Sequence, residues 1–149
     1  MARHGRPAVS MRAVRLSRVP VIAIVDDDEA MRDALCELVQ VMGFSTEAFD
    51  CAAAFLAGLA PGRFDCLITD VRMPGMDGID LQRRLRALGS TMPVVVITSA
   101  PDPAGRARAL EGGACAYLAK PVDDCALLDH LRSALGHGED PGDQANDED

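Results

Sequence analysis

The sequence lacks three features that would each have indicated a particular class of protein. No stretch reaches the roughly 18 apolar residues that a membrane span needs, and the arginine-rich start has no apolar segment typical of a signal peptide. A GxxxxGK[ST] loop is absent, which excludes a P-loop nucleotide hydrolase. The five cysteines have no CxxC spacing, so we expect reduced thiols in a cytoplasmic protein.

Length and charge indicate one domain with two charged extensions. The 149 residues suit a single core, and a net charge of −8 disfavours non-specific binding to nucleic acid. Residues 1–18 carry five arginines and no acid, whereas residues 137–149 carry six acids and no base. We expect both extensions to be disordered and the domain to span 19–136. The basic arm could contact nucleic acid or a partner, but we favour an unstructured leader.

Acidic residues follow two apolar runs of the kind that form buried parallel strands. Asp26 and Asp27 come directly after residues 19–25, and Asp70 ends the run that begins at Cys66. Ligands of open α/β sheets gather outside the carboxyl ends of such strands, so these three carboxylates could share one pocket.

Carboxylates a few ångströms apart repel by about 4 kcal/mol per pair at a surface-like dielectric, so they bind protons or a cation. A site with only a few protein oxygen ligands suits Mg²⁺, because this ion keeps several water molecules and often has phosphate oxygens in its coordination shell. Two later apolar runs deliver Thr98 and Lys120 at their ends. Acids, a hydroxyl and an ammonium on one rim are the groups that phosphoryl transfer needs.

Five apolar runs alternate with amphipathic stretches, which predicts repeated β/α units and a mainly parallel sheet. The strand near 44–49 has the weakest signal. We expect helices from about Met31 to Gly43, over 52–59, after the MPGMDG loop, in a short segment before Gly112, and up to Gly136. In the third helix the pattern predicts an inward apolar face formed by Leu81, Leu85 and Leu88. The opposite, solvated face would carry Arg83, Arg84 and Arg86.

The segments VIAIVDDDEAMR, LITDVRMPGMDGIDL, VVVITSA and YLAKPV resemble the successive motifs of CheY-like response-regulator receiver domains. Among receiver domains, these motifs are most similar in sequence to those of the FixJ-like branch. The resemblance covers residues 19–136. It implies a flavodoxin-like, doubly wound (βα)5 fold with a five-stranded parallel sheet in the order 2-1-3-4-5.

The resemblance implies a response regulator of a two-component system. Because the sequence departs from FixJ-like proteins in having no output domain after residue 136, we expect a single-domain regulator. Such a protein takes a phosphoryl group from a sensor histidine kinase or a histidine phosphotransfer protein and is not a turnover enzyme, although it can lose the group by autodephosphorylation. Phosphorylation would change the face formed by the fourth helix, fifth strand and fifth helix. That face would contact a downstream protein target or form a homodimer.

Asp70 is implied as the phosphoacceptor, and an ordinary ionised aspartate needs positioning rather than a base to act as a nucleophile. Asp27, Asp70 and the main-chain carbonyl of Arg72 are implied as Mg²⁺ ligands, with Asp26 acting largely through water. The competing interpretation of the DDDE segment is a helix N-cap, a role that suits Asp28 and Glu29. A cap alone explains neither Asp70 nor a lysine at the same rim.

Thr98 is implied as the hydroxyl that binds the phosphoryl group, and Lys120 as its cation, with the Lys120–Pro121 bond in the cis form. Tyr117 is implied as a switch that turns inward when Thr98 moves, although a half-buried strand tyrosine remains an alternative. We also expect the side chain of Arg72 to tune the lifetime of the phosphoryl group.

Two other functions are weighed against this one. A phosphohydrolase of the haloacid-dehalogenase type would carry a second aspartate two residues after the nucleophile, where this sequence has Arg72. A DNA-linked regulator would act through the arginine-rich arm. No helix-turn-helix domain follows residue 136, so direct DNA binding is not expected.

Overall fold

The computed structural model describes residues 19–136, and the predicted disorder of residues 1–18 and 137–149 lies outside this range. Strands and helices alternate five times within it. The strands are β1 Val21–Val25, β2 Ser45–Phe49, β3 Cys66–Asp70, β4 Val94–Thr98 and β5 Ala116–Ala119. The helices are α2 Glu29–Val41, α3 Ala52–Ala57, α4 Gly78–Ala87, α5 Pro103–Glu111 and α6 Asp124–Ala134.

All strand pairs are parallel, and the sheet has the order β2-β1-β3-β4-β5, which confirms the predicted flavodoxin-like topology. The weakly signalled strand β2 is present and pairs with β1. Asp70 lies opposite Ile97 in β4, and Thr98 lies opposite Ala119 in β5. Because the strands are parallel, the carboxyl ends of β1, β3, β4 and β5 lie at one edge of the sheet.

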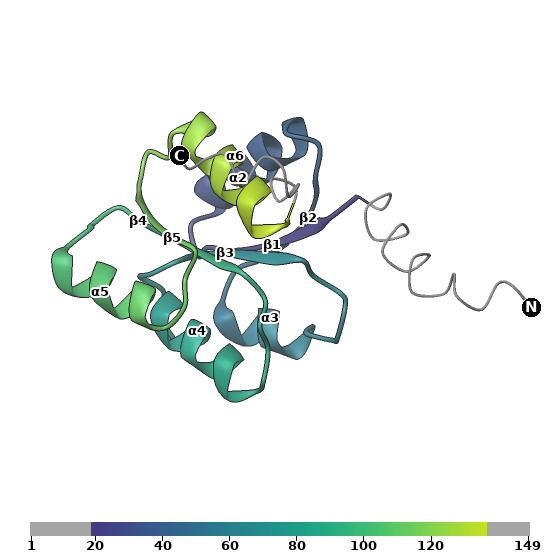
Figure 1. Cartoon of the computed structure of the whole chain (residues 1–149). Helices are drawn as coiled ribbons and strands as arrows, with labels where there is room; N and C mark the ends of the chain where they lie inside the picture. The colour runs from purple at the N-terminus through teal and green to yellow at the C-terminus, as the bar shows by residue number, and fades with distance from the viewer. Residues whose placement is uncertain (1–18, 137–149) are drawn as a thin grey trace, which may run out of the picture.

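The sheet is covered on both faces (Figure 1), with α2 and α6 on one side and α3, α4 and α5 on the other. Alternate residues of β1 supply the two cores. Ile22 and Ile24 pack on the side of α2 and α6, whereas Ala23 and Val25 pack on the opposite side. Strands β1, β3 and β4 are buried on both faces, which explains why they appear in the sequence as nearly continuous apolar runs. The edge strand β2 is partly exposed and has no such run.

Aspartates start four of the five helices. The side chains of Asp28, Asp77, Asp102 and Asp123 each accept a hydrogen bond from a backbone N–H in the first turn of α2, α4, α5 and α6. Such caps satisfy donors that the helix leaves open. The N-cap interpretation of the acidic cluster is therefore correct for Asp28, one residue beyond the two carboxylates assigned to the site.

Three details of the predicted helices are wrong. Leu88 is 60% exposed rather than inward, because α4 ends at Ala87 and Leu88 is its C-cap. Arg86 is half-buried rather than solvated, since its guanidinium donates hydrogen bonds to the carbonyls of Ser90 and Met92. Helix α3 ends at Ala57, two residues earlier than expected.

The cysteines and the helices of the described residues can be compared with the expectations from composition. All five cysteines are unpaired, and Cys66 is the buried one. Burial raises the pKa of its thiol, which keeps it protonated and unreactive. Among residues 19–136, the helices are too short or too polar to cross a membrane.

Candidate phosphoryl and metal site

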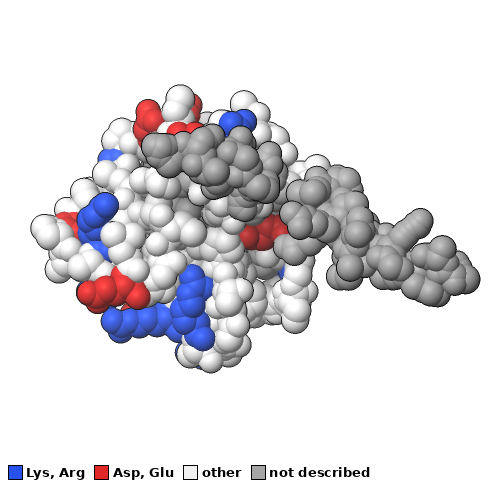
Figure 2. Space-filling model, viewed as in Figure 1, with Lys and Arg blue, Asp and Glu red and all other residues white. Residues whose placement is uncertain are grey.

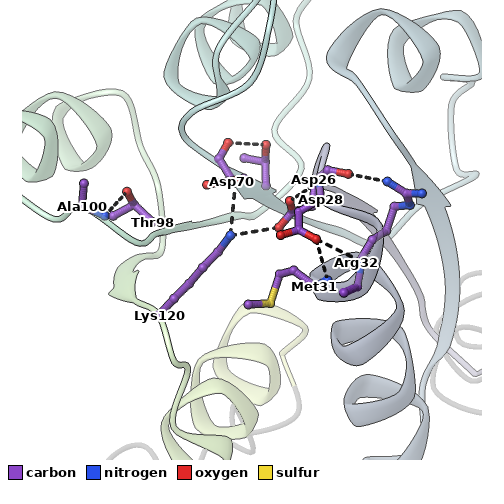
Figure 3. A network of polar contacts seen from close by, with 10 residues as sticks. Asp26, Asp28, Met31, Arg32, Asp70, Thr98, Ala100 and Lys120 are labelled. Carbon is purple, nitrogen blue, oxygen red and sulfur yellow. Dashed lines mark hydrogen bonds and ion pairs between the residues drawn. The ribbon is translucent and has the colours of Figure 1, made fainter.

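Three side chains from different strands meet at the carboxyl edge of the sheet (Figure 3). Asp26 follows β1, Asp70 ends β3, and Lys120 follows β5. The Lys120 Nζ lies 3.1 Å from Oδ2 of Asp26 and 3.2 Å from Oδ2 of Asp70. All three side chains are largely buried, so the ammonium bridges two carboxylates in a poorly solvated place. The Lys120–Pro121 bond is cis, as the sequence resemblance implied.

The end of β1 is held by contacts on both sides of Asp26. Its Oδ1 accepts a hydrogen bond from the backbone N–H of Asp28 at 2.9 Å. The side chain of Arg32, one turn into α2, donates to the Asp26 carbonyl at 2.8 Å. Arg32 was not identified from the sequence, because a hydrogen bond from a side chain to a backbone carbonyl does not depend on the residue type of the acceptor and leaves no pattern in the residue order.

The carboxylates of Asp26, Asp27 and Asp70 offer oxygens that all lie within 4.8 Å of one another. Asp27 is exposed to solvent, whereas the other two are buried. An all-oxygen donor set with one solvated member fits a hard divalent ion that retains water, such as Mg²⁺. The predicted acidic residues are therefore together, at a spacing that suits the predicted ion.

The charges of the site shift two pKa values. Burial raises the pKa of Asp70, the neighbouring Asp26 carboxylate raises it further, and Lys120 opposes both. Burial alone would lower the pKa of Lys120, but its hydrogen bond to Asp26 and the two negative charges outweigh burial and raise it. Lys120 is therefore a permanent cation at neutral pH.

The backbone at the end of β3 is packed closely against the start of α4. The N–H of Gly78 donates to the Val71 carbonyl at 2.9 Å, and Thr69 Oγ1 donates to the Asp70 carbonyl at 2.9 Å. A Cβ at position 78 would lie 2.0 Å from the Asp70 carbonyl oxygen. Only glycine at position 78 allows the start of α4 to pack this closely against the backbone of Asp70. This role of Gly78 was not predicted from the sequence.

Thr98, Arg72 and Tyr117 surround an open pocket of about 590 Å³ that lies beside these charges. Thr98 is buried, and its hydroxyl accepts a hydrogen bond from the Ala100 N–H at 3.0 Å. Arg72 is exposed at the rim, two residues beyond Asp70. Tyr117 is only 8% exposed, deeper than a half-buried strand tyrosine, and its hydroxyl accepts a hydrogen bond from the Asp102 N–H at 3.2 Å.

Fold and site together define a flavodoxin-like domain that gathers acidic groups and one lysine at the carboxyl edge of its sheet. Residues 22–132 match the family model of the response regulator receiver domain, and the chain belongs to this family of two-component signalling proteins.

Relatives and solved structures agree with this assignment. The transcriptional regulatory protein FixJ of Bradyrhizobium diazoefficiens is 41% identical over 118 residues, which are 79% of this chain and 58% of FixJ. The response regulator protein TodT of Pseudomonas putida is also 41% identical over 118 residues, 79% of this chain and 52% of TodT. The chain thus spans about half the length of these curated relatives.

Among solved structures, FixJ-N superimposes with a TM-score of 0.74 at 33% identity, covering 80% of this chain and 96% of FixJ-N. The chemotaxis protein CheY4 of Vibrio cholerae gives a TM-score of 0.72 at 27% identity, covering 79% of this chain and all of CheY4. The predicted CheY-like and FixJ-like resemblance is confirmed.

Proposed function

We propose that Asp70 accepts a phosphoryl group from a sensor histidine kinase or a histidine phosphotransfer protein in a reaction that depends on Mg²⁺. Phosphoryl acceptance is general to receiver domains. The observation that supports Asp70 in this chain is the Lys120 ammonium, which is bonded to both Asp70 and Asp26. All three side chains are largely buried, and the exposed carboxylate of Asp27 lies beside the other two.

In the proposed step, a carboxylate oxygen of Asp70 attacks the phosphorus of a phosphohistidine. The new P–O bond forms as the P–N bond breaks, and the imidazole nitrogen keeps the electron pair and takes up a proton. Lys120 offsets the charge of the phosphoryl oxygens, and the Thr98 hydroxyl, whose oxygen accepts a hydrogen bond from the Ala100 N–H, donates its own proton to one of them. Asp26 keeps the ammonium directed at the site.

Mg²⁺ would be held by Asp27, Asp70 and the Arg72 main-chain carbonyl, with Asp26 acting largely through water, and would neutralise charge during transfer. The exposed Arg72 side chain at the pocket rim would govern how readily water reaches the acyl phosphate. Replacement of Arg72 by alanine should therefore change the dephosphorylation rate.

The output would pass from Thr98 through Tyr117 to the face formed by α5, β5 and α6. Figure 2 shows basic side chains gathered over α4 and α5 with acidic ones beside them, a mixed surface that suits a protein partner or a second copy of the chain. The relatives FixJ and TodT are named as regulators, one of them transcriptional. We infer that the described domain itself acts by protein contact rather than on DNA.

Intact mass after incubation with acetyl phosphate and Mg²⁺ tests the proposal. We expect one phosphoryl adduct per wild-type chain, none with Asp70→Asn or Asp70→Ala, and an unchanged adduct with Asp33→Asn, which alters an exposed acid on α2. An adduct that survives loss of Asp70 would overturn the assignment. Repeated turnover of a generic phosphate ester would instead support a phosphohydrolase.

A further inference from the structure

Gly105 lies in the first turn of α5, buried on the side that faces Tyr117 of β5. An ideal Cβ at position 105 would lie 2.8 Å from the Tyr117 hydroxyl oxygen and 2.6 Å from Oδ1 of Asp102. Both distances are shorter than Cβ atoms reach in proteins. No side chain fits at this position while the tyrosine and the aspartate keep their places.

The same three residues are joined by hydrogen bonds. The Asp102 N–H donates to the Tyr117 hydroxyl at 3.2 Å, and the Gly105 N–H donates to Oδ1 of Asp102 at 2.8 Å. Asp102 is the N-cap of α5. The phenol ring therefore rests against the start of α5 and binds its capping residue, and this contact depends on the open space above Gly105.

We propose that Gly105 is a positioning residue that keeps Tyr117 in its buried seat and thereby ties β5 to the start of α5. The proposal deepens the function proposed above, since it specifies what sets the position of the switch tyrosine; only its consequence for signalling rests on that function. A side chain at position 105 would push the ring out of the pocket or displace the start of the helix.

The far end of α5 is held separately. The buried Gln82 of α4 donates from Nε2 to the Ala109 carbonyl at 3.1 Å, and the Arg86 guanidinium donates to the carbonyls of Gly112 and Gly113 at 3.4 Å. Displacement caused at Gly105 should therefore be confined to the first turn of α5 and to Tyr117. The Tyr117 ring should therefore report a substitution at Gly105 more sensitively than the rest of α5 does.

Tyr117 is the only tyrosine in the sequence, and tryptophan is absent, so intrinsic fluorescence reports on this ring alone. We would measure acrylamide quenching and the near-UV circular dichroism of the full chain. The wild type should be quenched much less than N-acetyltyrosinamide. Gly105→Ala should raise the quenching constant several-fold and weaken the dichroism. Arg106→Ala, at an exposed position of the same helix, introduces the same residue without lowering helix propensity and should leave both unchanged.

If the wild-type chain is quenched as readily as N-acetyltyrosinamide, Tyr117 is not buried and the proposal is overturned. This test does not require Gly105→Ala to fold. Equal quenching of wild type and a folded Gly105→Ala would also overturn the proposal. Neither measurement needs a phosphoryl donor. A failure of Asp70 to accept phosphate would overturn the proposed function, while the quenching result would still decide the role of Gly105.

A double-mutant cycle separates the hydroxyl contact from a general effect on the helix. In a Tyr117→Phe background the nearest ring atom to a Cβ at position 105 is Cζ at 3.6 Å, an ordinary contact. Gly105→Ala should therefore lower the urea midpoint more with tyrosine at 117 than with phenylalanine. The contact with Asp102 is common to both backgrounds and cancels. Equal shifts in both backgrounds would overturn the proposal.

Discussion

The Nζ of Lys120 lies 3.2 Å from Oδ2 of Asp70, although the two residues are 50 positions apart in the sequence. Lys120 is the only lysine in a chain whose other basic residues are arginines. Its ammonium also bonds Asp26, so one compact cation offsets two buried carboxylates. A lysine ammonium suits this place because it is a compact point charge with three donors, which can bond both carboxylates at once.

Removal of this cation should be costly. Lys120→Met is expected to lower the free energy of unfolding by about 3 to 5 kcal/mol in buffer without divalent ions, because two buried carboxylates lose their partner. Urea denaturation of the full chain measures the loss, with Arg132→Met as a matched exposed control. A loss below about 1 kcal/mol, the size of a surface ion pair, would show that the bridge is solvated.

Asp70→Asn should stabilise the protein at neutral pH. Since burial and Asp26 raise the pKa of Asp70 in the folded chain, folding favours the protonated acid and its ionised form costs stability. A neutral amide removes this cost, and we expect a gain of about 1 kcal/mol. The gain should vanish as the pH falls through the raised pKa towards the ordinary value of 3.8, where both folded and unfolded wild type become protonated.

The measurement is a series of urea midpoints at different pH values for wild type, Asp70→Asn and the exposed control Asp33→Asn. Lower stability of Asp70→Asn at neutral pH would contradict the argument and would mean that the bond to Lys120 outweighs burial.

Magnesium should stabilise the wild-type chain through the three clustered carboxylates. An ion that binds only the folded state adds about 2.7 kcal/mol when its concentration is one hundred times its dissociation constant. Asp27→Asn should reduce the rise of the thermal midpoint with Mg²⁺, and Asp33→Asn should not. An identical response of wild type and Asp27→Asn would place the ion elsewhere.

The resemblance to receiver domains predicted the order of the strands in the sheet. The residues at the carboxyl edge could be predicted from the residue pattern, because buried parallel strands appear in the sequence as apolar runs and the candidate site residues come at the ends of those runs. Asp26, Asp70 and Lys120 could be found in this way. Arg32 and Gly78 could not be found, since each acts on a backbone carbonyl of a strand end, a contact that leaves no pattern of residue types. Periodicity also misplaced Leu88, because it does not record where α4 ends.

Gly78→Ala should disturb the strand end that carries Asp70. The added Cβ would lie 2.0 Å from the Asp70 carbonyl oxygen, a backbone atom that cannot rotate away. We expect a loss of about 3 kcal/mol in stability and a slower rate of phosphorylation. Gly58→Ala is a suitable control, because its Cβ meets the end of the exposed Arg63 side chain, which can move. Comparable losses for the two variants would refute the role of Gly78.

Hydrogen exchange should show that α5 opens at a lower free energy than α2. Helix α5 buries only Gly105 and Ala109, neither of which brings a large apolar side chain to the core, whereas α2 buries Leu35 and Val39. Little apolar burial leaves the helix to its intrinsic stability, which a helix of nine residues cannot supply alone. Exchange measured by mass spectrometry on the intact chain should be faster in α5 than in α2, which serves as the internal reference. Equal protection of both helices would mean that the bonds from Gln82 and Asp102 at its two ends hold α5 as firmly as a buried face holds α2.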